Sequence, residues 1–244
     1  MFASRKVGLF ALTMLTAMAA PHAAFAYRPF DSTDPAVAEP GEVEIELSPV
    51  SFRHDDSGEN WIAPQLRLNY GFARDWEIVV EGQGEHSQGA TSALIENAVF
   101  LKHVLREGTL QDQQGLSIAA EAGVLLPGIN GDSGMGAEVA GIIGNRWSWG
   151  AIHATAAFSL TRDNRGEVFF GTIIEGPGDW AVRPVAELVY EREFGTTEVV
   201  AALIGFIWEA KENLAFDLAV RHAGINGEPE TEIRLGLTFA FSRR

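Results

Sequence analysis

Apolar and polar residues alternate one by one through residues 61–85 of this chain. From Ile62 to Phe72 every second residue is apolar apart from a proline, and Trp76, Ile78 and Val80 resume the pattern after a three-residue interruption. Successive side chains of a β-strand point to opposite faces, so a period of two predicts strands. Two such runs around a short turn predict a β-hairpin.

The same alternation recurs along most of the chain and predicts twelve strands. An even count is typical of bacterial single-chain membrane barrels, whose tilted strands cross the bilayer in roughly 9–11 residues. Ten strands stay open as an alternative, because the pattern is weak in residues 167–174. The predicted strands span residues 41–52, 61–72, 76–85, 94–104, 116–126, 136–147, 150–160, 167–174, 180–190, 198–208, 214–221 and 232–241.

The residues at the turns and on the polar faces favour a membrane barrel over a soluble β-sandwich. Aromatic residues flank the predicted turns, as at Trp76 and at the Trp147–Trp149 pair, where a barrel places its interfacial girdle. Glu42, Glu44 and Glu46 share one face of the first strand. They would be costly in a packed core unless paired, whereas a wet lumen accommodates them. We therefore predict an all-β, up-and-down antiparallel transmembrane β-barrel, with the sandwich left as the alternative.

The N-terminal residues predict export. Arg5 and Lys6 precede an apolar run, and Ala24-Phe25-Ala26 has the small-x-small form of a cleavage site. Residues 1–26 are expected to be a cleavable secretory signal, with the mature chain starting at Tyr27. Residues 27–40 are expected to form an extended periplasmic lead-in, and 41–244 a barrel in the outer membrane. The expected partners are outer-membrane lipid and the export and barrel-assembly machinery.

Composition excludes several classes of function. The chain has no cysteine, so it has neither disulfides nor thiolate metal sites. Its formal net charge of −15 argues against nucleic-acid binding, which needs basic patches. Asp31, Asp34 and Glu39 lack the ligand spacing of a calcium loop and are expected to be solvated. No metal or cofactor is therefore expected.

Charged residues on the polar faces are the candidate functional residues, because this face would line the lumen. Two alternatives stay open: an open pore, or a lumen filled by mutual salt bridges. Charges near the C-terminal end, with Glu198, are expected to form a mixed-charge ladder across neighbouring strands. The lumen-lining candidates are Glu44, Arg67, Glu77, Glu81, Glu96, Lys102, Glu121, Arg183, Glu187, Asp217, Arg221 and Arg234.

A histidine and a hydroxyl give a remote alternative. His153 and Thr155 lie two apart on one predicted strand face, as a base and a nucleophile could in a membrane-embedded, lipid-modifying hydrolase. The sequence has no Gly-x-Ser-x-Gly elbow. The protein is therefore expected not to be an enzyme.

Several segments resemble the outer-membrane proteins grouped as the MetA-pathway of phenol degradation family. The opening Arg28-Pro29-Phe30 with Pro40-Gly41-Glu42 carries the resemblance best, and Phe241 followed by three more residues departs from the usual outer-membrane ending. The remaining similar segments are 64–70, 76–80, 99–102, 123–128 and 186–188.

The resemblance implies an outer-membrane barrel without an established activity. Some family members are encoded near aromatic-degradation pathways and are proposed to admit substrates. The expected function is therefore a passive channel for small hydrophobic or aromatic compounds. The alternative is a structural or plugged barrel without transport.

Overall fold

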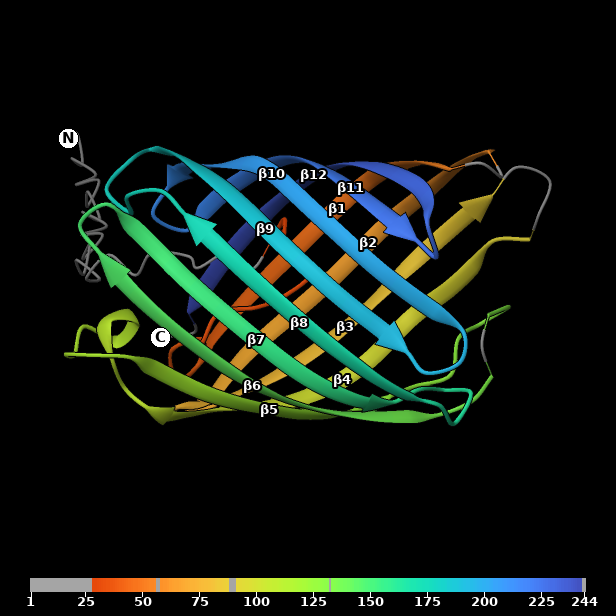
Figure 1. Ribbon diagram of the computed structural model, residues 1–244. Coiled ribbons are helices and arrows are strands. Elements are labelled where there is room, and N and C mark those ends of the chain that lie inside the picture. The colour runs from red at the N-terminus through yellow and green to blue at the C-terminus, as the bar shows by residue number, and fades with distance from the viewer. Residues whose placement is uncertain (1–27, 56–57, 88–90, 132, 243–244) are drawn as a thin grey trace, which may run out of the picture.

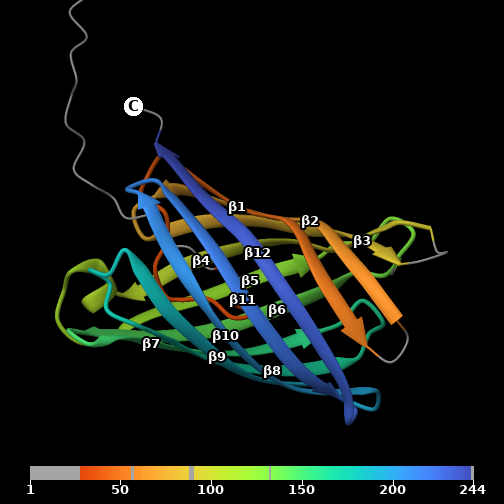
Figure 2. The same ribbon diagram turned by 90° about the horizontal axis from the view of Figure 1, so that it is seen from above.

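The computed structural model describes residues 28–55, 58–87, 91–131 and 133–242, which form one closed barrel of twelve antiparallel strands (Figure 1). The predicted signal lies outside the described residues. Each strand pairs with its neighbours in the chain, and β1 pairs with β12 to close the ring (Figure 2). The elements are β1 (Glu42–Asp55), β2 (Gly58–Ala73), β3 (Trp76–Ser87), β4 (Ala93–Arg106), the 3-10 helix η1 (Thr109–Gln111), β5 (Ser117–Leu125), β6 (Gly136–Trp147), β7 (Gly150–Leu160), β8 (Gly166–Glu175), β9 (Val182–Glu193), β10 (Thr197–Lys211), β11 (Leu214–Ile225) and β12 (Glu228–Ser242).

The predicted fold class and the count of twelve strands are confirmed. Several strands extend beyond the predicted bounds, above all where β1 and β12 pair. There Arg53 lies opposite Glu232 and His54 opposite Thr231. Apolar alternation ends before these polar residues, but the backbone hydrogen bonds of the ladder continue through them. No helix in the described ranges is long and apolar enough to cross a bilayer.

The barrel has two distinct ends. We call the end at which β1 begins and β12 finishes the terminal end, and the opposite one the loop end; in Figure 1 the terminal end lies on the left. At the loop end Asn226 and Gly227 join β11 to β12 with φ angles of 52° and 91°. Two successive positive φ angles suit the twist of a hairpin, and Asn-Gly adopts them readily.

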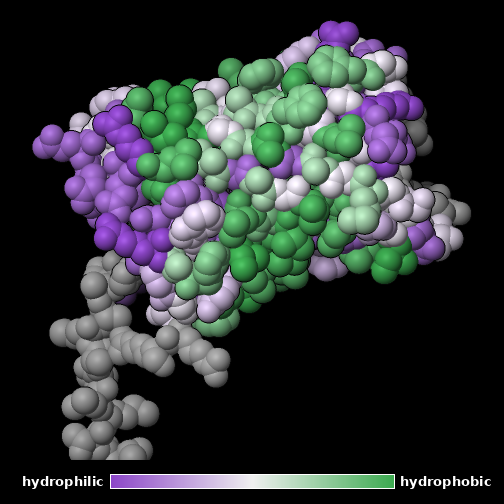
Figure 3. All heavy atoms as spheres, turned by 90° about the horizontal axis from the view of Figure 1, so that it is seen from below, coloured by the Kyte–Doolittle hydropathy of each residue, from purple (hydrophilic) through white to green (hydrophobic). Residues whose placement is uncertain are grey.

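The outer surface carries an apolar belt. Hydrophobic residues gather over the middle of the face drawn in Figure 3, while hydrophilic residues gather toward its ends. Leu188 on β9 and Ile204 on β10 are 64% and 69% exposed. Their neighbours Arg183 and Glu187 on β9 are buried, so the two faces of this strand have opposite polarity. An apolar exterior around a polar interior suits a barrel that spans a bilayer.

This orientation predicts the effect of a charge on the outer face. Leu188→Arg should destabilise the barrel in lipid by about 2–4 kcal/mol, because the guanidinium would lie within the hydrocarbon. The matched change Phe194→Arg, just past the end of β9, should cost about 0–1 kcal/mol near the interface. Denaturant titration of both variants in lipid vesicles measures the difference. Equal costs would contradict the assignment of Leu188 to the lipid face.

Candidate functional site

The segment before β1 lies inside the barrel. Arg28, Ser32, Thr33, Asp34 and Ala36 are each at most 7% exposed. We call residues 28–38 the inner segment. This corrects the expectation of an extended lead-in for the part of 27–40 that the structure describes, and the three acidic residues 31, 34 and 39 do not share one solvated loop. The cause is electrostatic: the charged side chains of the segment find partners on the lumen wall.

Both flanks of the inner segment bind wall residues far away in sequence. The Arg28 guanidinium donates to Gln65 Oε1 on β2 at 2.8 Å and lies 3.5 Å from Asp217 Oδ2 on β11. Near the terminal end, the Ala38 amide donates to Glu77 Oε2 on β3 at 2.7 Å. The segment therefore reaches from wall to wall before it enters β1.

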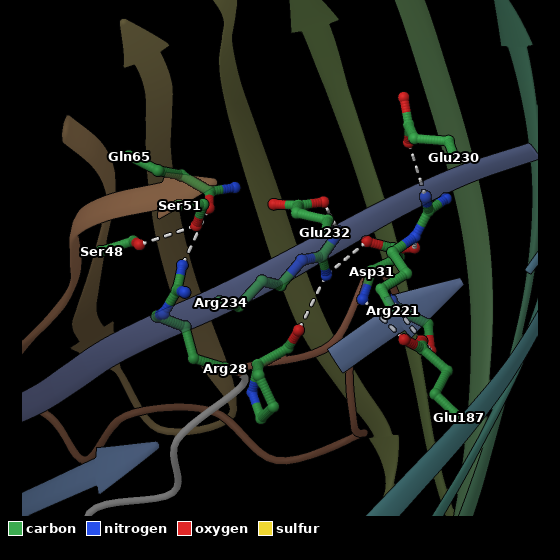
Figure 4. Close-up of polar contacts among 12 residues, drawn as sticks. Arg28, Asp31, Ser48, Ser51, Gln65, Glu187, Arg221, Glu230, Glu232 and Arg234 are labelled. Carbon is green, nitrogen blue, oxygen red and sulfur yellow. Dashed lines mark hydrogen bonds and ion pairs between the residues drawn. The ribbon is translucent and has the colours of Figure 1, made fainter. Parts of the chain in front are cut away.

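Asp31 is the centre of these contacts. Its carboxylate accepts hydrogen bonds from Arg221 Nε on β11 and Arg234 Nη1 on β12, both at 2.7 Å. Figure 4 shows the two guanidinium groups converging on it. Arg234 also donates to the Pro29 carbonyl at 2.8 Å. The backbone amide of Asp31 points the other way and donates to Glu187 on β9 at 2.8 Å.

The surroundings of Asp31 predict how pH affects this anchor. Burial alone would raise the pKa of its carboxyl group, but Arg234 and Arg221 outweigh it and lower the pKa from 3.8 to about 2. A group whose pKa falls on folding stabilises the folded form above its ordinary pKa, and that stabilisation is lost as pH falls through the folded value. The anchor should therefore be constant from neutral pH to about pH 4 and weaken between about 4 and 2. The NMR shift of the Asp31 carboxyl carbon, followed across this range in the folded barrel, would test it; a titration midpoint of Asp31 near pH 6 would contradict it.

A second anchor joins the inner segment to β4 and β7. Lys102, which is fully buried, donates to Thr33 Oγ1 at 3.3 Å and lies 3.9 Å from Asp34 Oδ1. The Thr155 hydroxyl on β7 donates to the Thr33 carbonyl at 3.0 Å. Lys102 thus contributes a contact to the segment rather than a free charge in an open pore.

Apolar contacts complete the enclosure. The inner face of β10 carries Val199, Ala201, Leu203 and Ile207, all buried, and Phe30 packs against the cluster that contains Ile207. The expected mixed-charge ladder is therefore interrupted at β10. Glu198 is about half exposed and lies 3.9 Å from Arg192, away from the lumen.

The remaining candidates form separate groups on the wall. Arg67 lies 3.0 Å from Glu81 and 3.7 Å from Glu121, on β2, β3 and β5. Glu44 on β1 is buried, whereas Glu96 on β4 is 61% exposed at the loop end, where Arg162 lies 3.3 Å away.

Arg183 belongs to another group, near the terminal end. It lies 2.9 Å from Glu175 and 2.5 Å from Glu209, so its ion pairs within the described residues are with these two glutamates and not with Glu187. The structure thus brings Glu187, Arg221 and Arg234 together around Asp31, while Arg183, Arg67 and Glu96 have other partners.

A cavity opens above the inner segment toward the loop end. Its volume is about 660 Å³; Arg28, Phe30 and Asp31 lie at its floor, and its wall reaches Thr161 and Asp163 in the β7–β8 connection. We call this cavity the vestibule. Its charged lining contains twelve carboxylates and six arginines, so it is acidic.

The histidine of the hydrolase hypothesis is held in a different arrangement. His153 is 1% exposed, and its Nε2 lies 3.0 Å from Glu175 Oε1. Among the hydrogen bonds of the described residues, none joins His153 to a hydroxyl, and Thr155 donates to a carbonyl instead. No group of three or more potential metal ligands occurs in the part of the chain that the structure describes. The geometry therefore offers no activated nucleophile beside this histidine.

Comparison with known proteins supports the fold. No protein-family model matches the chain, so the resemblance to the MetA-pathway family gains no support there. No curated protein matches it either. Among solved structures, the KdgM porin matches with a TM-score of 0.55 and 11% identity over 81% of this chain and 99% of that one. The NanC porin matches with a TM-score of 0.59 and 5% identity over 81% and 98%. The chain therefore shares the barrel architecture of these porins.

Proposed function

We propose that the protein is an outer-membrane channel for small solutes whose lumen is closed by the inner segment. Export by the signal before Tyr27 and an outer-membrane location belong to this proposal. The observation that carries it is the vestibule: a cavity of about 660 Å³ ends on a segment that belongs to no strand of the barrel. Side-chain contacts hold that segment, so it can leave without unpairing the sheet. The porin architecture is consistent with this function but does not establish it.

The class of solute rests on different grounds. Small hydrophobic or aromatic compounds are proposed from the family resemblance alone. The vestibule has apolar wall residues such as Phe100 and Phe169, but most of its charged lining is acidic. Polar solutes without net negative charge therefore fit its chemistry better.

A plugged barrel without transport is the second candidate, and the density of contacts on the inner segment favours it. Osmotic swelling of liposomes that contain the folded barrel separates the two functions, with arabinose as polar probe and salicin, an uncharged phenyl glucoside, as aromatic probe. Swelling with either probe supports a channel, and its preference reports the class of solute. The structural function would be favoured if neither probe caused swelling in the wild type or in a variant whose inner segment is released by replacing Arg28, Asp31 and Asp34 with alanine. Heat-shifted gel mobility confirms in each case that the barrel is folded.

A further inference from the structure

The wall around Asp31 has the form of a preassembled binding site for a carboxylate. Two arginines approach one carboxylate, each from 2.7 Å. Glu230 lies 3.2 Å from Arg221 Nη1, and Glu232 lies 3.0 Å from Arg234 Nη2. These glutamates belong to the wall and hold the guanidinium groups in place. The site would thus persist if the inner segment left.

The opposite side of the site is a carboxylate, Glu187, that forms no ion pair with a Lys or Arg of the described residues. Glu187 is 2% exposed and accepts from the Asp31 amide at 2.8 Å, the Ser32 amide at 2.8 Å and the Ser32 hydroxyl at 2.5 Å. All three donors are neutral, although a buried charge is best matched by an opposite charge. An ammonium group carries three N–H donors and a positive charge. It would satisfy Glu187 better than the segment does.

We propose that Glu187, Arg221 and Arg234 form a binding site for a small zwitterion, an amino carboxylate such as β-alanine. Asp31 occupies the site as an internal substitute for it. Its nitrogen and its carboxylate carbon are separated by Cα and Cβ, the same two-carbon spacing as in a β-amino acid. The nitrogen donates to Glu187, and the carboxylate accepts from both arginines.

This inference rests on the proposed channel and names its class of solute. The acidic vestibule disfavours a free carboxylate, but a zwitterion carries no net charge and its ammonium end is attracted. Because Asp31 is tethered, it competes at an effective concentration on the order of millimolar. A solute above that concentration would displace Asp31 and so raise the population in which the inner segment has left the lumen.

Cysteine labelling measures this displacement directly. The chain has no native cysteine, and Ala36 in the inner segment is 5% exposed, so Ala36→Cys gives one buried thiol. Its reaction with a hydrophilic maleimide is measured on the full folded barrel in detergent. β-Alanine should raise the labelling rate about tenfold when its concentration is about ten times the tethered concentration. Propionate and propylamine, which each carry one of the two charges, should leave the rate unchanged.

Two further variants fix the interpretation. Asp31→Ala, made in the Ala36→Cys chain, should raise the labelling rate without any solute. This result would show that labelling reports release of the segment. In Glu187→Gln, made in the Ala36→Cys chain, the part of the site that would bind the ammonium group is uncharged, so β-alanine should lose its advantage over propionate. Equal effects of propionate and β-alanine on the Ala36→Cys chain would overturn the proposal. The proposal would also be overturned if Asp31→Ala raised the labelling rate but no solute did. It would be overturned as well if the thiol stayed unreactive in the Asp31→Ala chain.

The labelling needs no flux, so it is independent of the liposome test. If the barrel does not conduct but its labelling rate responds to β-alanine, the binding site is supported and the channel function is contradicted. If the barrel conducts but its labelling rate does not respond, the channel function is supported and the binding site is contradicted.

Discussion

Replacing Arg28, Asp31 and Asp34 together with alanine is expected to open the lumen. The triple variant removes the ion pairs to Asp217, to Arg221 and Arg234, and to Lys102. A hydrogen bond to a charged group contributes about 1.5–3 kcal/mol. Loss of even one such contact shifts the open population about tenfold or more, since about 1.4 kcal/mol corresponds to a factor of ten. Ion current through planar bilayers should rise accordingly.

The control for the triple variant is the exposed pair Arg192 and Glu198, whose replacement by alanine should leave the current unchanged. An equal current in the wild type and the triple variant would contradict closure by the segment. The triple variant is expected to fold, because all three replaced residues precede β1. Heat-shifted gel mobility verifies that each barrel is folded.

Arg234→Ala is expected to have the largest effect on stability. Its guanidinium contacts Asp31, the Pro29 carbonyl and Glu232. Breaking a buried ion pair leaves an uncompensated charge and costs about 3–5 kcal/mol. The free energy of unfolding in detergent or lipid, from denaturant titration, measures this cost.

The matched control is Arg192→Ala near the loop end of β9. Arg192 is about half exposed and lies 3.9 Å from Glu198, so the change should cost no more than about 1 kcal/mol. A comparable loss of stability in both variants would show that the network around Asp31 contributes no more than a surface pair.

The strands could be predicted from the sequence because the physics that defines them is local. Alternation alone places 136–147 and 150–160 at the bounds that β6 and β7 have in the structure. It also identifies the outward face, as Leu188 and Ile204 illustrate. Strand ends such as Asp55 are missed by this pattern. The strand continues there because its backbone pairs with the neighbouring strand, although the apolar alternation has already ended.

The inner segment could not be predicted in the same way, because its contacts join residues up to 205 positions apart. Its proline-rich, polar composition resembles that of a solvated linker. The available signal was the charge spacing of Arg28, Asp31 and Asp34, which matches opposite charges on the wall. Recognising it requires the relative positions of β4, β9, β11 and β12. The same reason explains why Glu230 and Glu232, which orient the two arginines, were not among the candidates.

Hydrogen–deuterium exchange of the native barrel tests most directly whether the inner segment lies in the lumen. The amides of Asp31, Ser32 and Ala38 donate to buried carboxylates on β9 and β3. A peptide that covers residues 30–38 should therefore exchange far more slowly than the same sequence in an unstructured chain. Exchange at the unstructured rate, in a barrel whose strands are protected, would contradict the central claim that this segment closes the lumen.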